Sequence, residues 1–242
     1  MKFKTSITNI TPDGTEIIRG KNLEDLMRGQ SFSTTIFFLL FQKMPSEKEL
    51  KMWDALLVAA IDHGPGTASA LTARISASAK NSMHTSLAAG LLGLGERHGL
   101  AIEGAMRFFK ENKDTADLPK LLKHMKEQKK YVPGFGHKVL TVDSRALTLL
   151  EIAKEQGYFL EHCEFALKVR EELNSSSSKP LPINIDGAMA AILCDMNVDA
   201  RLAQGIFMIA RAPGLVAHIY EETVNDEGIR RLEEGEIEYI GA

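Results

Sequence analysis

Apolar residues recur along most of the chain at the three- and four-residue spacings that place side chains on one face of a helix. The clearest run follows the capping-box sequence at residues 46–49 and aligns Leu50, Trp53, Leu57 and Ile61. Comparable patterns occur at about residues 67–80, 82–94, 97–112, 117–129, 143–156, 159–173, 186–196, 199–210 and 213–223. The sequence therefore predicts an all-α fold with about a dozen helices.

The first 30 residues carry a different pattern, in which two short apolar stretches flank a turn. Residues 5–10 and 16–18 lie on either side of the sequence Thr-Pro-Asp-Gly-Thr, where proline presets φ and glycine accepts a positive φ. Asn22 then stands where a helix N-cap is expected, and Gly29 where that helix ends. We predict a small N-terminal β-hairpin followed by a short helix.

Two loop-like stretches divide the helical pattern. Residues 131–137 are rich in glycine and proline, and residues 174–182 contain four consecutive serines. They bracket a shorter helical segment. We therefore predict a large helical domain formed by residues 1–137 and 174–242, and a small helical domain formed by residues 138–173, with the two loops as hinges.

Composition and charge argue against several classes of partner. The 242-residue chain carries 29 Lys and Arg against 32 Asp and Glu, a formal charge of −3, so no nucleic-acid partner is expected. No strictly apolar run is longer than residues 55–61, which are far fewer than the roughly 20 residues that cross a bilayer, so no membrane partner is expected either. Two cysteines without a partner motif, Cys163 and Cys194, favour a reducing compartment and a cytoplasmic location.

Some apparent motifs have simpler explanations than a binding site. The glycines within residues 90–95 follow no strand, so close helix packing explains them better than a dinucleotide loop. The seven histidines lack metal-ligand spacing, and no metal is expected. The lysines of residues 120–130 are typical of a solvated helix face, although such a face beside a cleft can also hold phosphates.

Three stretches point to chemistry. Residues 132–138 form a constrained loop that presents His137 and its own backbone N–H groups. Asp186 is a lone carboxylate among apolar residues at a helix start, where it serves either as an N-cap or as a functional acid. Arg211 and His218 interrupt an apolar helical stretch, and a buried arginine normally needs an anion. Together they favour acid/base chemistry on a carboxylated substrate.

In this order, the motifs resemble those of citrate synthases and of the related citryl-CoA lyase modules, including the cleavage module of ATP-citrate lyase. The segments that carry the resemblance are residues 18–26, 31–32, 44–50, 62–74, 90–99, 134–145, 182–186 and 211–218. The resemblance implies an all-α fold with a large and a small domain, a homodimer, and carbon–carbon bond chemistry between acetyl-CoA and oxaloacetate. It also implies that an acyl-CoA and a small carboxylic acid are the substrates, with no tightly bound cofactor.

The resemblance assigns roles to individual residues. Asp186 is expected to exchange the proton at the acetyl methyl carbon, His98 to hydrogen-bond the thioester oxygen, and His137 to polarise the ketone of oxaloacetate or accept the citryl hydroxyl proton. The residues expected to bind the substrate carboxylates are His63, Arg145 and Arg211. The residues expected to contact the coenzyme A thioester are Val132, Gly134, Gly136 and Lys138.

Three functional hypotheses remain open on the sequence. The chain is shorter than full citrate synthases ahead of Asp62, and the sequence Asp-His-Gly-Pro at residues 62–65 resembles the lyase modules, which favours a citryl-CoA lyase. The sequence His98-Gly99 resembles synthases and favours a short citrate synthase acting on oxaloacetate or a related 2-oxo acid. An inactive helical scaffold or regulatory subunit is the third. Arg230 or Arg231 is the candidate for the arginine that synthases extend to a partner site, if this chain has one.

Overall fold

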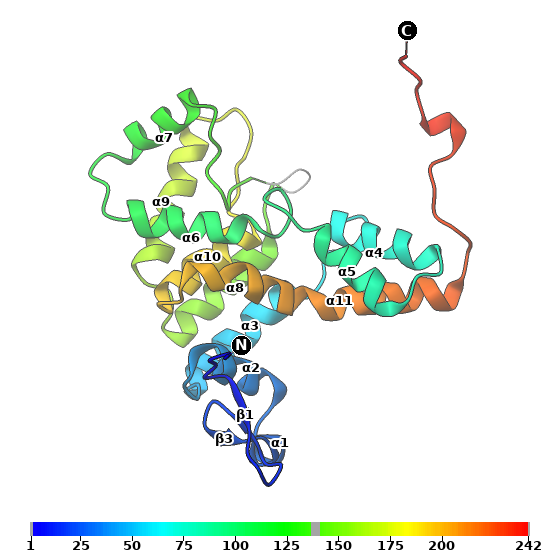
Figure 1. Cartoon of the computed structure of the whole chain (residues 1–242). Coiled ribbons are helices and arrows are strands. Elements are labelled where there is room, and N and C mark those ends of the chain that lie inside the picture. Colours follow the sequence, from blue (N-terminus) through cyan, green and yellow to red (C-terminus); the bar gives the residue numbers. More distant parts are fainter. Residues whose placement is uncertain (1, 137–140, 242) are drawn as a thin grey trace.

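The structure is a computed structural model that describes residues 2–136 and 141–241. Within those ranges it contains eleven α-helices, two short 3-10 helices and one antiparallel sheet of three short strands (Figure 1). The elements are β1 (Thr8–Ile10), β2 (Glu16–Ile18), β3 (Lys21–Asn22), α1 (Leu23–Gly29), α2 (Phe32–Phe41), α3 (Glu47–Ala59), α4 (Ala68–Ser78), α5 (Met83–Leu92), α6 (Ala101–Asn112), α7 (Leu118–Glu127), α8 (Ser144–Gln156), α9 (Glu161–Ser175), α10 (Ile185–Asp195), η1 (Ala200–Leu202), α11 (Ala203–Asn225) and η2 (Glu234–Glu236). The predicted all-α class is confirmed.

The N-terminal hairpin is confirmed and carries one more strand than predicted. β1 pairs with β2 around the predicted turn, and β2 pairs with β3 because Arg19 and Gly20, both at positive φ, reverse the chain. Asn22 caps α1 as expected. α2 was not predicted, because its last six residues, 36–41, are all apolar and show no polar face. Ser31 caps it.

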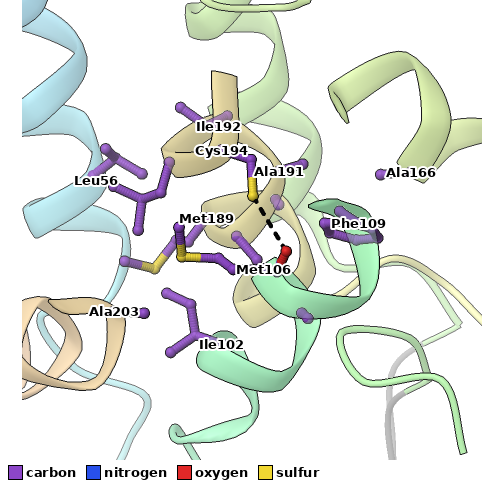
Figure 2. Packing of buried hydrophobic residues seen from close by; sticks show 14 of the residues in the cluster. Leu56, Ile102, Met106, Phe109, Ala166, Met189, Ala191, Ile192, Cys194 and Ala203 are labelled. Atoms are coloured by element: carbon purple, nitrogen blue, oxygen red, sulfur yellow. Dashed lines mark hydrogen bonds between the residues drawn. The ribbon is translucent and has the colours of Figure 1, made fainter. Parts of the chain in front are cut away.

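The hydrophobic core is organised around α10, which is buried along nearly its whole length. Figure 2 shows Met189, Ala191 and Ile192 of this helix packed among side chains of α3, α6 and α9. Cys194 donates a hydrogen bond from Sγ to the backbone oxygen of Met106, 3.6 Å away. A helix that is apolar on all sides must be enclosed by other helices, as α10 is here.

The C-terminal helix corrects a prediction. The sequence indicated two helices, at 199–210 and 213–223, separated by a break at Pro213 and Gly214; the structure has one helix, α11, with Pro213 inside it. Proline removes one backbone hydrogen bond, at a cost of about 3 kcal/mol or more in a helix interior. Burial of Ala210, Leu215 and Ile219 on both sides of the proline outweighs that loss.

α11 also has the length and mean hydropathy of a membrane-crossing helix, a property that core helices of soluble proteins share. In this structure one face of it packs on α3, α4, α5 and α6. Figure 1 shows α4, α5 and the C-terminal half of α11 lying together at one side of the molecule, with the C-terminal segment extending from the end of α11.

Between the two predicted hinge loops lie α8 and α9. α8 packs on α3 and α10, and α9 packs on α10, α6 and α7. The division into a large and a small domain stays a prediction. The close packing predicted for residues 90–95 is confirmed at Gly90, where an added Cβ would lie 2.9 Å from Cβ of Ala73 on α4.

Candidate active site

A cavity of about 400 Å³ lies where the first turns of α8 and α10 meet α11 and the loops that precede α4 and α6. Its walls combine residues that are far apart in the sequence. They are His63, Gly66, Thr67, Ala68, Arg97, His98, Gly99, Gly136, Asp143, Arg145, Asn184, Ile185, Asp186, Phe207 and Arg211. The structure therefore brings the predicted residues His63, His98, Arg145, Asp186 and Arg211 to one cavity.

Asp186 lies in the first turn of α10 but does not cap it. The N-cap is Asn184, whose side-chain oxygen accepts a hydrogen bond of 3.1 Å from the backbone N–H of Gly187. Among the residues that the structure describes, no donor reaches the buried Oδ1 of Asp186. Because Asn184 is the cap, the interpretation of Asp186 as a structural cap is wrong. A buried carboxylate oxygen without a partner is costly to stability, which favours the interpretation of Asp186 as a functional acid.

Burial sets the protonation of Asp186. Loss of solvent raises its pKa from the ordinary value of 3.8 to about 6, although the positive charges of Arg211 and Arg145 oppose the rise. The negative charge of Asp143 raises the pKa further. A carboxyl group with a pKa near 6 can both give and take a proton near neutral pH, as a general acid or base must.

Arg145 is held in place by the residue that caps its own helix. Asp143 accepts hydrogen bonds from Nε of Arg145 at 3.0 Å and from Nη2 at 2.9 Å, and it also accepts one from the backbone N–H of Ile185 at 3.2 Å. Asp143 thereby joins the starts of α8 and α10. Burial raises its pKa, but these hydrogen bonds and the charge of Arg145 outweigh burial, so the net pKa lies below the usual range.

Arg211 is one of the largest fully buried side chains, with 2% of its surface exposed. Its Nε donates to the backbone oxygen of Ala60 at 2.7 Å, and its guanidinium lies 5.1 Å from the ring centre of Phe207. Burial lowers its pKa. Within the described part of the chain, Nη1 of Arg211 and Nη1 of Arg145 are both buried without a hydrogen-bond partner. Two unpaired guanidinium donors beside one cavity fit a ligand with more than one carboxylate.

His98 is presented by a tight loop between α5 and α6. The backbones of Gly95 and His98 exchange two hydrogen bonds, of 2.9 and 2.8 Å, and Gly99 follows at a positive φ. A Cβ at Gly99 would lie 2.5 Å from the ring of Phe207, so the loop packs directly on α11. Nε2 of His98 lies 2.9 Å from the hydroxyl of Ser69, and this contact helps to orient the imidazole ring.

The loop of residues 132–136 packs on the start of α10. A Cβ at Gly134 would lie 2.6 Å from Cα of Gly187, and the backbone oxygen of Gly134 accepts from the N–H of Asn184 at 3.1 Å. The N–H of Gly136 donates to the oxygen of Pro182 at 2.7 Å, so this predicted ligand donor is already used within the chain. The predicted residues His137 and Lys138 lie outside the described residues.

A second, larger hollow adjoins the same loop. It has a volume of about 700 Å³ and lies between α7, the end of α9 and residues 129–135. Its apolar floor includes Leu122, Val132, Phe135, Leu173 and Leu181, and its rim carries Lys123, Lys126, Lys129 and Lys130. The predicted contact residue Val132 thus lines this groove, whereas Gly136 lines the cavity. The lysine face that the sequence assigned to solvent borders a groove of a size that holds a ligand.

No cluster of three or more His, Cys, Asp or Glu side chains that could hold a metal ion occurs among the described residues. The charged and titratable groups of the cavity are three guanidiniums, two imidazoles and two carboxyls, and one of the carboxyls, that of Asp143, is paired with Arg145. This set is suited to binding carboxylates and moving protons.

Comparison with known protein families identifies the family to which this chain belongs. Residues 50–232 match the family model for the C-terminal domain of citrate synthase, so the chain belongs to the citrate synthase family. The family predicted from the motifs is confirmed, and with it the prediction of an enzyme.

Two solved structures and one curated sequence show which members of the family this chain is similar to. The citryl-CoA lyase from Hydrogenobacter thermophilus superposes with a TM-score of 0.90 and 41% identity, over 99% of this chain and 95% of that one. The ATP citrate lyase of Methanosaeta concilii, solved with (3S)-citryl-CoA, has a TM-score of 0.89 and 26% identity, over 100% of this chain and 42% of that one. The ATP-citrate synthase of Mus musculus is 27% identical over 220 residues, which are 84% of this chain and 20% of that protein. This chain therefore spans about a fifth of the length of such curated relatives.

Sequence reasoning missed the residues that support the site. Asp143 lies in the segment 134–145 that carries the family resemblance but was given no role in the site, although its separation of two residues from Arg145 allows a side-chain pair. Asn184 was not singled out, yet an Asn two residues before Asp186 is itself a cap signal. Ser69 lies in the segment 62–74 that resembles the family, but its contact with His98 was not predicted, because it spans 29 residues of sequence.

Proposed function

We propose that the protein is a citryl-CoA lyase that cleaves citryl-CoA to acetyl-CoA and oxaloacetate. The observation that carries the proposal is the set of three buried polar atoms without partners in the described chain: Nη1 of Arg145, Oδ1 of Asp186 and Nη1 of Arg211. The two guanidinium nitrogens can donate hydrogen bonds to substrate carboxylates, and Asp186 can donate a proton, all in a single cavity. The 41% identity with a lyase of nearly equal length supports the choice of substrate.

The reaction can be written so that its protons balance. The hydroxyl proton of the citryl group goes to a base, the role that the sequence resemblance gives to His137. The carbon–carbon bond then breaks, its electron pair passes to the acetyl fragment as an enolate, and the hydroxyl carbon becomes the ketone of oxaloacetate. Asp186 gives its proton to the enolate carbon. One proton is taken up and one is released by the protein.

The enolate is the difficult species, because it is far more basic than a carboxylate. It forms only if its oxygen is hydrogen-bonded in a site that excludes water. His98 is our candidate donor, held by Ser69 and by the loop that packs on Phe207. The raised pKa of Asp186 keeps a proton available for carbon near neutral pH.

The lysine-rimmed groove suits the nucleotide end of the coenzyme A thioester. That part of the molecule carries several phosphate charges and an apolar ring, and the groove offers four lysines around an apolar floor. The loop of residues 132–136 separates the groove from the cavity, since Val132 and Phe135 line one and Gly136 the other. A thioester bound in the groove would reach the cavity past this loop.

The function is tested by supplying the purified chain with citryl-CoA and following oxaloacetate through a coupled NADH-dependent reduction. A second reaction contains acetyl-CoA and oxaloacetate, and free CoA is followed with a thiol reagent. Cleavage without release of free CoA supports the lyase. Release of free CoA in the second reaction favours the short citrate synthase, and no activity in either favours the inactive scaffold.

We also propose that the chain forms a homodimer through the outer face of α4 and α5. Leu71, Ile75 and Leu92 are exposed there, at 45%, 44% and 85% of their surface. Gly90 and Ser86 are used within the chain, against α4, so the interface would use the opposite side of α5. Sedimentation at micromolar concentration tests the dimer, and a monomer would refute it.

A further inference from the structure

One face of α11 holds the turn that carries His63. Arg211 donates to the backbone oxygen of Ala60, as described above. Three residues further along, Gly214 approaches the same turn so closely that an added Cβ would lie 2.2 Å from the backbone oxygen of Ile61. Four residues further, Nε2 of His218 lies 3.0 Å from Oδ1 of Asp62. Spacings of three and four residues place all of these contacts on one side of the helix.

Asp62 connects this helix face to His63. Its second oxygen, Oδ2, accepts a hydrogen bond of 2.9 Å from the backbone N–H of Gly64, which has a positive φ of 85°. The carboxylate therefore closes a tight turn around His63, and His63 lines the cavity. Partial burial raises the pKa of Asp62, but hydrogen bonds from Gly64, His63 and His218 outweigh it and hold the pKa below the usual range. Asp62 is thus an acceptor at both oxygens.

The hydrogen bonds of His218 fix which ring nitrogen carries the proton. Nη1 of Arg74 lies 3.4 Å from Nδ1 of His218. A guanidinium can only donate, so Nδ1 accepts and Nε2 is the nitrogen that donates to Asp62. Arg74 is held in turn by Glu222, whose side chain is 1% exposed, at 2.8 Å. The orientation of the imidazole is therefore set from both sides.

We propose that His218 is a positioning residue for substrate binding, which acts through Asp62 to hold the turn of His63 against the cavity. The inference rests on the proposed function in one respect, because it assumes that His63 contacts oxaloacetate. The sequence singled out His218 beside Arg211 but gave neither His218 nor Asp62 a role in the site, and His218 does not line the cavity. Its contribution would be the orientation of another side chain, and orientation errors of about 1 Å can lower rates by about a hundredfold.

The experiment measures binding of oxaloacetate and, separately, of CoA to the whole protein by titration calorimetry. His218→Leu removes both hydrogen bonds of the imidazole. His218→Gln keeps a donor for Asp62 and an acceptor for Arg74. Asp62→Asn keeps the side-chain volume but cannot accept from both His218 and Gly64, so it tests the same contact without a cavity. His124→Leu, at an exposed position on α7, is the control for the chemical change.

We expect His218→Leu and Asp62→Asn each to weaken oxaloacetate binding about tenfold, while CoA binding stays within twofold of wild type. His218→Gln should restore oxaloacetate binding to within about threefold, and His124→Leu should not change it. Unchanged oxaloacetate binding in Asp62→Asn, or equal losses for both ligands, would overturn the inference, as would failure of Gln to rescue. If the wild type itself does not bind oxaloacetate, the proposed function fails instead.

Discussion

Replacing Asp186 by Asn should make the protein more stable at neutral pH, because the wild type holds a buried carboxylate whose Oδ1 has no partner in the described chain. Burial raises the pKa of this group from 3.8 to about 6. Between those values the folded protein binds more protons than the unfolded chain does, so stability falls as the pH rises through this window. The full difference corresponds to about 3 kcal/mol above pH 7. Below about pH 4 it disappears, because the group is protonated in both states.

Asn cannot ionise, so Asp186→Asn removes this penalty. The amide still needs hydrogen-bond partners, so we expect a net gain of about 1–3 kcal/mol in the free energy of unfolding at pH 7.5. For a chain of this size the gain corresponds to a rise of about 2–10 °C in Tm. The measurement is thermal unfolding of both proteins at equal protomer concentration, at pH 7.5 and at pH 4.

The same helix provides a matched control. Asp195, in the last turn of α10, is also buried, but it accepts hydrogen bonds from the backbone N–H groups of Leu160, His162 and Cys163 and lies 2.8 Å from Nδ1 of His162. Asp195→Asn should lower stability by about 1–3 kcal/mol, because an amide cannot accept from all of these donors. A loss of stability at pH 7.5 in Asp186→Asn, or a gain that persists unchanged at pH 4, would refute the reasoning.

Three further predictions concern catalysis and one concerns packing. Asp186→Asn should lower turnover by about 10²–10⁴-fold with little change in KM, measured as initial rates of citryl-CoA cleavage. In the wild type, kcat/KM for cleavage should fall as pH rises above about 6, because Asp186 must hold a proton to give it to carbon; a flat profile would exclude it as the acid. Arg211→Met should raise KM for citryl-CoA at least about tenfold by removing a carboxylate donor, and an unchanged KM would contradict that role. Gly187→Ala would place a Cβ 2.2 Å from the backbone oxygen of Gly134 and should cost about 1–3 kcal/mol in unfolding experiments, whereas Gly205→Ala, with open space around it, should not destabilise.

The sequence predicted most helices because their apolar stripes are local signals. The capping box that opens α3 and the asparagine that caps α1 were both found where expected. α2 and the continuity of α11 were missed for two different reasons. Uniform apolarity hides a helical period, and a proline looks like a break unless the packing on both of its sides is known.

The candidate site was predicted by residue type and motif, but its support was not. Local signals placed Asp186 and Arg145 each at the start of a helix, yet nothing in either segment shows that Asp143 joins them by accepting from Arg145 and from Ile185. Such contacts between distant segments depend on the packed fold. The sequence can therefore name the groups that react, whereas the groups that orient them become visible only once the helices are placed.

The residues that react and the residues that orient them differ in whether their buried polar atoms have hydrogen-bond partners. Asp143 and Asp195 are buried and their oxygens accept hydrogen bonds from described residues, as expected of groups that stabilise the fold. Asp186, Arg145 and Arg211 each keep one buried polar atom without a partner among the described residues, at a cost to stability. A fold that tolerates this cost at three positions around one cavity gains from it only when a ligand supplies the missing partners. All three unpaired atoms therefore lower the stability of the protein without ligand, and the two guanidinium donors among them explain why a dicarboxylate should bind there.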